Sequence, residues 1–164
     1  SYYMTDIWKY NPETDSWSEG PTFTGDEFYA GLADFEGLTL NGSGYLFIYN
    51  YLYRLDGAVW TDMRAPFDMT AWDNLAFTYK GRAYIGMGCP HASGGTGYIW
   101  EWNPAVNSVT RLNNYFENAR QAGSVFVIGE RVFITGGHTM NSAGTAYIIR
   151  NDVWEYDPNV PVRF

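Results

Sequence analysis

The sequence offers few side chains that could bind a transition metal. Cys89, His91 and His138 are its only thiol and imidazole groups, and such groups are common ligands of zinc and copper in proteins. They lie in two separate glycine-rich stretches, without the close i, i+2 or i, i+4 spacing that places two ligands side by side on a strand or helix. We therefore expect no metal centre and no cofactor. A site that joins all three residues is the weaker alternative.

Carboxylates are numerous but scattered. The chain has 18 Asp and Glu residues, and no pair has a spacing that predicts two carboxylates facing each other across a substrate, as glycoside hydrolysis requires. Several lie in stretches that favour turns: Asp26, Glu27, Asp34, Asp62, Asp68, Asp73 and Glu117. The sequence also lacks a Ser/His/Asp order, a phosphate-binding loop and a dinucleotide-binding fingerprint. We therefore expect a protein that is not an enzyme.

Composition narrows the fold class and the partners. The formal net charge of −8 would repel a phosphate backbone, and no cluster of Lys and Arg reverses that sign locally, so nucleic acid is not an expected partner. No stretch approaches the roughly 18 apolar residues of a membrane span. The single cysteine excludes an internal disulfide. Aromatic residues make up 19% of the chain against 17% for charged residues, which favours half-buried sheets over charged helices.

The opening stretch "DIWKYNPETDSW" (6–17) recurs along the chain. Similar stretches are "YLYRLDGAVWTDM" (51–63), "YIWEWNPAVNSVTRL" (98–112) and "NDVWEYDPNV" (151–160). Alignment on Trp8, Tyr53, Trp100 and Trp154 gives steps of 45, 47 and 54 residues. Two further apolar runs precede each later copy, with tight turns predicted at Asn41-Gly42, Lys80-Gly81 and Gly129-Glu130. A unit of four strands at this period is typical of a propeller blade.

These copies resemble the kelch repeat, in which the second strand ends in Gly-Gly, the third reads x-W-x-Y-[DN]-P and the fourth carries a Trp. The match covers essentially the whole chain and is close at Gly136-Gly137, at 153–158, and at 8–12 followed by Trp17. It departs from the pattern at Tyr49-Asn50, at Gly86-Met87-Gly88 and at Val109. The resemblance implies an all-β, kelch-type β-propeller segment of about three four-stranded blades, part of a six- or seven-bladed ring.

We expect one domain over residues 1–164, with blade parts at 1–20, 28–64, 72–112 and 120–158. Closed propellers use about 4 to 8 blades, so this chain alone is not expected to close. Three explanations are open: a fragment of a longer chain, two chains that share one ring, and an open arc capped by another protein. We favour the first.

The recurring aromatic residues are expected to form the core between blades, because residues two apart on a strand share a face and pack beside the neighbouring strand. The positions concerned are Trp8, Tyr10, Trp17, Tyr53, Trp60, Trp100, Trp102, Trp154 and Tyr156. On this reading Trp154→Ala should cost about 3 to 5 kcal/mol of stability. Gly136 and Gly137 are expected to leave room for an aromatic side chain of the neighbouring blade.

The resemblance places the working surface on the loops that join strand two to three and strand four to the next strand one. The two-to-three loops differ sharply between copies, the longer ones being 89–97 and 138–151. Arg120 matches a position where kelch repeats often carry an arginine facing the central opening, and Phe28 and Ala71 occupy the equivalent places. The candidate binding residues are therefore Phe28, Tyr29, Trp72, His91, Arg120, His138 and Asn141. Alternatively, Tyr29 and Trp72 pack between blades.

The expected function is a non-catalytic binding module that recognises a protein or a glycan through its loop face, since aromatic faces with a few polar groups suit sugars and peptides. One alternative is a kelch-superfamily enzyme, such as a sialic acid mutarotase or another carbohydrate-active enzyme. Another is an architectural subunit that docks through open blade edges at residues 1–10 and 150–158, with a second propeller chain or a larger assembly completing the ring. The resemblance to exported bacterial kelch proteins implies a periplasmic, cell-surface or secreted location.

Overall fold

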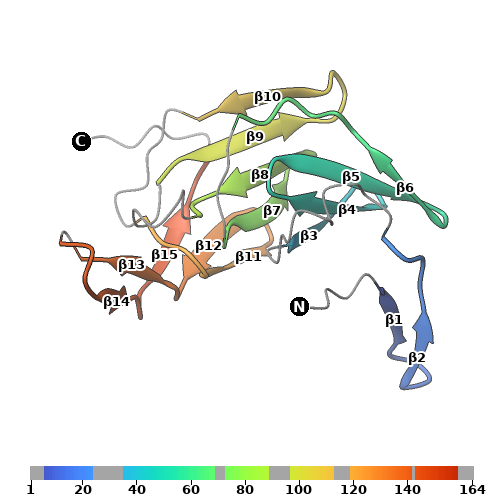
Figure 1. Ribbon diagram of the computed structural model, residues 1–164, viewed down its shortest axis with the longest axis horizontal. Coiled ribbons are helices and arrows are strands. Elements are labelled where there is room, and N and C mark those ends of the chain that lie inside the picture. Colours follow the sequence, from blue (N-terminus) through green and yellow to red (C-terminus); the bar gives the residue numbers. More distant parts are fainter. Residues whose placement is uncertain are drawn as a thin grey trace.

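The computed structural model describes residues 6–23, 35–68, 73–88, 97–112, 119–141 and 143–158 of the 164-residue chain. All regular secondary structure in these residues is β-strand. Figure 1 shows the strands as a row of sheets, with β1 and β2 set apart at one side. The first sheet pairs β1 (Trp8–Asn11) with β2 (Ser16–Glu19). Both strands are short and exposed.

Two complete four-stranded antiparallel sheets follow, each with consecutive strands side by side. The first contains β3 (Phe35–Leu40), β4 (Ser43–Ile48), β5 (Tyr51–Asp56) and β6 (Val59–Asp62). The second contains β7 (Leu75–Tyr79), β8 (Arg82–Gly86), β9 (Ile99–Asn103) and β10 (Ser108–Arg111). Strand β7 contacts β3 on one side and β11 on the other, so the first strands lie together, as they do around a propeller axis.

The last sheet has the order β11-β12-β15, and a small hairpin is inserted between its second and third strands. Its strands are β11 (Ser124–Ile128), β12 (Arg131–Thr135) and β15 (Val153–Tyr156), and the hairpin pairs β13 (His138–Met140) with β14 (Tyr147–Ile149). Among the described residues β15 pairs only with β12, and β1 only with β2. These units confirm the predicted all-β propeller segment.

Strand register confirms the repeat alignment. The aligned residues Tyr53, Trp100 and Trp154 occupy the same place in their sheets, because each pairs with an apolar residue of the preceding strand, namely Leu46, Ile85 and Ile134. In the fourth strands, Trp17 and Trp60 pair with the third strand at the register position that Val109 occupies in the β7–β10 sheet. The sequence pattern therefore placed equivalent residues correctly.

The predicted turns are also confirmed by their backbone angles. Asn41 and Gly42 have φ angles of 51° and 79°, and Lys80 and Gly81 have angles of 46° and 74°. Two consecutive positive φ values match the type I′ turn that suits the twist of a β-hairpin. Gly129 alone is positive in its pair, at 60°, as in a type II′ turn. Local sequence thus fixes each hairpin.

The core lies between sheets that pack face to face. Between the two four-stranded sheets it contains Phe47, Leu52, Ile85 and Trp102, all fully buried, together with Phe67 from the segment after β6. Between the β7–β10 sheet and the last sheet it contains Phe77, Tyr84, Ile99, Ile134 and Tyr156. A smaller cluster joins Phe23 to Ile48 and Tyr53. Each sheet therefore depends on its neighbours to bury its apolar faces.

The structure corrects the expectation that all the recurring aromatic residues are buried. Trp102, Tyr53 and Tyr156 are buried, and Trp60 and Trp100 are half-buried. Four others are exposed: Trp8 at 54%, Tyr10 at 47%, Trp17 at 65% and Trp154 at 42%. The first three lie on a face of the β1–β2 hairpin that no other described sheet covers, and Trp154 lies on edge strand β15. Position in the repeat sets the direction of a side chain, whereas burial requires a neighbouring sheet.

The reason for glycine at position 137 also differs from the expected one. A Cβ atom on Gly137 would lie 2.6 Å from the backbone oxygen of Gln121 and 2.9 Å from the Cα atom of Gly123. The close neighbour is therefore the backbone that leads into β11, and not an aromatic side chain. A Cβ atom on Gly136 would meet no atom within 4 Å. Both glycines have positive φ angles, 64° at Gly136 and 76° at Gly137.

We expect Gly137→Ala to lower the free energy of unfolding by roughly 2 to 4 kcal/mol, because a left-handed backbone and a backbone clash add together. Gly136→Ala is the matched control, since it meets only the first penalty and should cost about 1 to 2 kcal/mol. Urea denaturation of both variants measures the difference. Equal losses would contradict the close approach of the 121–123 backbone.

Candidate functional site on the loop face

We call one end of the sheets the loop face: the end where second and fourth strands finish and first and third strands begin. Antiparallel pairing aligns Leu75, Gly86 and Ile99 there, next to the end of β10. This is the surface that the kelch resemblance indicated.

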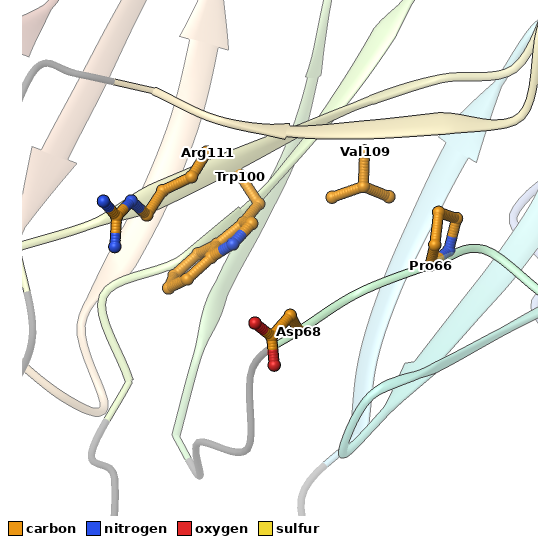
Figure 2. A pocket seen from close by; sticks show the side chains of 5 residues that line it. All are labelled: Pro66, Asp68, Trp100, Val109 and Arg111. Atoms are coloured by element: carbon orange, nitrogen blue, oxygen red, sulfur yellow. The ribbon is translucent and has the colours of Figure 1, made fainter.

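A pocket of about 270 Å³ lies in this region, between the two four-stranded sheets. It is lined by Pro66 and Asp68 from the segment after β6, by Trp100 of β9, and by Val109 and Arg111 of β10. In the view of Figure 2, Trp100 lies between Arg111 on one side and Val109 and Pro66 on the other, with the Asp68 carboxylate below. The pocket thus combines one large aromatic ring with a cationic and an anionic group.

Strand pairing positions one wall of the pocket. Trp100 and Arg111 are direct cross-strand partners, and the next pair on the same sheet face is Trp102 with Val109. Because alternate residues of a strand share a face, Trp100 and Val109 point toward the β3–β6 sheet while Trp102 anchors the wall in the core.

Alternating burial positions the opposite wall. Ala65 and Phe67 are buried, and the Phe67 ring packs edge-on against Phe47 with centroids 4.9 Å apart. Pro66 and Asp68 are consequently turned outward to the pocket. The Asn107 side-chain amide donates to the Met63 carbonyl oxygen at 2.8 Å, which ties this segment to the β9–β10 hairpin.

Tyr98 extends the aromatic surface beside the pocket. The Arg111 guanidinium lies over the Tyr98 ring, with its Cζ atom 4.7 Å from the ring centroid. The Tyr98 and Trp100 rings are 6.3 Å apart at an angle of 69°. Such a cation–π contact orients the guanidinium. An exposed arginine that would otherwise sample many rotamers is thereby held near the pocket.

Arg120 does not face an open rim. Its side chain is fully buried, at 0% exposure, and it forms a bidentate ion pair with Asp152, with N–O distances of 2.7 and 3.2 Å. It also donates to the Gly136 carbonyl oxygen at 3.0 Å. Hydrogen bonds from Arg120 and then from Trp154 lower the pKa of Asp152 to about 2. This pair ties the entry to β11 to the entry to β15, which is a structural role.

His138 and Asn141 have structural partners too. The backbones of His138 and Gln121 form a two-way bridge at 2.9 and 3.0 Å, and their side-chain Nε2 atoms lie 2.7 Å apart. The Tyr147 ring packs edge-on against the His138 ring at 4.5 Å. Asn141 accepts a hydrogen bond from the Thr145 backbone N–H at 2.8 Å and so shapes the β13–β14 turn. Both residues therefore stabilise the inserted hairpin.

The remaining predicted site residues, Phe28, Tyr29, Trp72 and His91, lie outside the described residues, as does Cys89. The sequence pattern did not predict this pocket. Asp68 was expected in a solvated turn and Trp100 in the core, Val109 was noted only as a departure from the repeat, and Pro66 and Arg111 carried no expectation. The only usable signal was the place of Trp100 and Arg111 at the loop end of their strands.

In the part of the chain that the structure describes, no group of three or more His, Cys, Asp or Glu side chains could hold a metal ion. The same residues include no helix that is long and apolar enough to cross a membrane.

Comparisons with known proteins address the fold. No protein-family model matches this sequence, and no curated protein sequence matches it. Among solved structures, the structure of YjhT is similar, with a TM-score of 0.57 and 19% sequence identity. The similarity covers 69% of this chain and 36% of the YjhT chain, so the present chain spans little more than a third of the length of YjhT. At this identity the likeness shows the propeller fold alone.

Proposed function

We propose that this propeller segment is a non-catalytic binding module that recognises a glycan through the loop-face pocket. The observation that carries the proposal is the half-buried Trp100 indole flanked by Arg111 and Asp68. The apolar face of a sugar ring can stack on an indole, while the hydroxyl groups of the sugar form hydrogen bonds with charged side chains. Arg111 supplies only donors and the Asp68 carboxylate only acceptors, so the two groups fix the orientation of a hydroxylated ligand.

The size of the pocket agrees with a small part of a glycan. Its volume of about 270 Å³ lies just below the range of roughly 300 to 1,000 Å³ that is usual for small-molecule sites. One sugar residue in the pocket, with the rest of the chain outside, fits this volume better than a large buried ligand. We also propose a periplasmic, cell-surface or secreted location, which is supported only by the resemblance to exported bacterial kelch proteins.

The ion pair of Arg120 bears on whether Asp152 could act in catalysis. A general acid or base works best when its pKa lies near the working pH. The pKa of Asp152 is lowered to about 2, chiefly by hydrogen bonds from Arg120, which leaves this carboxylate a weak base. Asp152 is therefore not proposed as the general acid or base of the alternative kelch-superfamily enzyme.

A second candidate function is protein binding through the inserted β13–β14 hairpin. Tyr147, Ile148 and Ile149 are all exposed on it, and exposed apolar side chains on a projecting hairpin are common in protein interfaces. The two candidates use different surfaces, so substitutions can separate them.

We expect the chain to bind immobilised glycans on a glycan array, and Trp100→Ala to weaken the strongest signal at least about tenfold, which corresponds to roughly 1.4 kcal/mol. Arg111→Ala, at an exposed position, should weaken the same signal without affecting folding. Calorimetric titration with the best glycan would give the dissociation constants.

Trp17→Ala is the matched control, because it removes an exposed indole away from the pocket and should leave glycan binding unchanged. Ile149→Ser should also leave it unchanged. Absence of any glycan signal, or equal loss in Trp100→Ala and Trp17→Ala, would overturn the proposal. Loss in Ile149→Ser alone would favour the hairpin as the binding surface.

A further inference from the structure

The last sheet presents an exposed apolar face away from the rest of the molecule. We call it the outer face: it carries Phe126 and Ile128 of β11, Phe133 of β12 and Val153 of β15. All but Phe133 are exposed, Phe126 at 41% and both Ile128 and Val153 at 62%. Residues on the opposite side of the same strands, Val132, Ile134 and Tyr156, are buried against the β7–β10 sheet. One side of this sheet is thus packed and the other is open to solvent.

The outer face repeats the face that the β7–β10 sheet uses to bind its neighbour. Phe126 and Phe133 are stacked cross-strand partners with ring centroids 5.3 Å apart. Phe77 and Tyr84 hold the same register positions in the β7–β10 sheet and are stacked at 5.0 Å. In that sheet the pair is buried, because the last sheet covers it.

A charged pair is repeated along with the aromatic pair. Arg131 and Glu155 form an ion pair at 2.7 Å across β12 and β15. Arg82 and Glu101 form the corresponding pair across β8 and β9, with a distance of 3.5 Å. An aromatic pair and a charged pair from the covered face of the β7–β10 sheet therefore both recur on a face that no described sheet covers. This repetition indicates what kind of surface fits the outer face, namely the apolar face of another blade.

A matching surface is present at the other end of the same chain. By register, Trp8, Tyr10 and Trp17 on β1 and β2 correspond to Trp100, Trp102 and Val109. Those three residues pack toward the preceding sheet in the β7–β10 blade. We call the exposed Trp8, Tyr10 and Trp17 set the leading face. Figure 1 shows β1 and β2 at one end of the row of sheets and β12 and β15 toward the other.

We propose that two copies of this chain associate head to tail, with the leading face of one copy packed on the outer face of the next. Both halves of a blade-to-blade interface are carried by one chain, and both are exposed. The two halves differ, so the contact is heterologous: it either closes a ring or continues into a longer assembly. This association uses no residue of the loop-face pocket and is independent of glycan binding.

Sedimentation velocity of the whole 164-residue chain tests the proposal. We expect oligomers at protein concentrations above about 10 µM, which corresponds to a dissociation constant usual for interfaces of moderate strength. Phe126→Asp on the outer face and Trp17→Asp on the leading face should each give a monomer of 18.6 kDa. An equimolar mixture of the two variants should give a dimer and nothing larger, because each variant keeps one intact face.

Val106→Asp is the control, since Val106 is exposed in the β9–β10 turn and should not change the assembly. Circular dichroism checks that each variant is folded, and Ile128→Asp replaces Phe126→Asp if the latter unfolds. A monomeric wild-type chain at all concentrations would overturn the proposal and would point to a covering blade supplied by a longer polypeptide. Assembly retained in Trp17→Asp, or no dimer in the mixture, would overturn it as well.

Discussion

Asp152→Asn is expected to lower the free energy of unfolding by about 3 kcal/mol. Arg120 is fully buried, and Asp152 is its bidentate carboxylate partner. Removal of one member of such a pair deprives the remaining buried charge of its bidentate partner, which typically costs about 3 to 5 kcal/mol. We expect the lower end because 33% of the Asp152 side chain is exposed and water can solvate part of the uncompensated charge. Urea denaturation of wild type and variant measures the loss.

Glu155→Gln is the matched control for this experiment. Glu155 pairs with Arg131 at 2.7 Å, the same distance as in the Arg120–Asp152 pair. The side chains of both Glu155 and Arg131 are exposed. Water and salt screen an exposed pair, so this substitution should have little or no effect on stability. Comparable losses from the two substitutions would show that burial of Arg120 is not what makes its ion pair important.

The pH dependence of stability should report the same pair. The pKa of Asp152 is lowered from 3.8 to about 2, first by hydrogen bonds from Arg120. Because the folded-state pKa lies below the unfolded value, the stabilisation is complete above the unfolded pKa and is lost as the pH falls toward 2. The difference in Tm between wild type and Asp152→Asn should therefore be constant near neutral pH and shrink below about pH 4. A constant difference down to pH 2 would contradict the lowered pKa.

Trp102→Ala should cost about 4 kcal/mol, the middle of the range for removal of a large buried aromatic side chain. Trp102 has no exposed surface, and its ring packs edge-on against Tyr45 with centroids 5.3 Å apart. Its Nε1 atom donates to the Asn107 side-chain oxygen at 2.9 Å. Trp102→Phe should recover most of the packing but lose this hydrogen bond, so its loss should be smaller. Chemical denaturation of both variants gives the comparison.

Trp154→Ala is the control for Trp102→Ala, and it tests the sequence-based expectation directly. The repeat pattern assigns both residues to the interior and predicts a loss of about 3 to 5 kcal/mol for Trp154. Because 42% of Trp154 is exposed, we now expect only about 1 kcal/mol in the isolated chain, from the smaller area that is removed from water. Equal losses at the two positions would mean that burial in this structure does not determine their contributions.

The sequence by itself determined the features that depend on near neighbours in the chain. The apolar runs and the recurring aromatic stretches predicted the strands, and the register of Tyr53, Trp100 and Trp154 confirmed that the repeats were aligned correctly. Asn41-Gly42 and Gly129 predicted turns whose φ angles the structure confirmed. These are local properties, because side-chain direction and turn type depend on the residues of one hairpin.

Only the tertiary structure decided which of these residues are buried and which form a site. Trp8, Trp100 and Trp154 hold the same place in the repeat, yet Trp100 is half-buried and lines a pocket with the segment after β6, whereas Trp8 and Trp154 are exposed. Arg120 was expected at an open rim, but Asp152, 32 residues away in the chain, holds it in the interior. Contacts between sheets depend on how distant segments pack, and a repeat pattern does not show whether a neighbouring sheet is present to cover a given face.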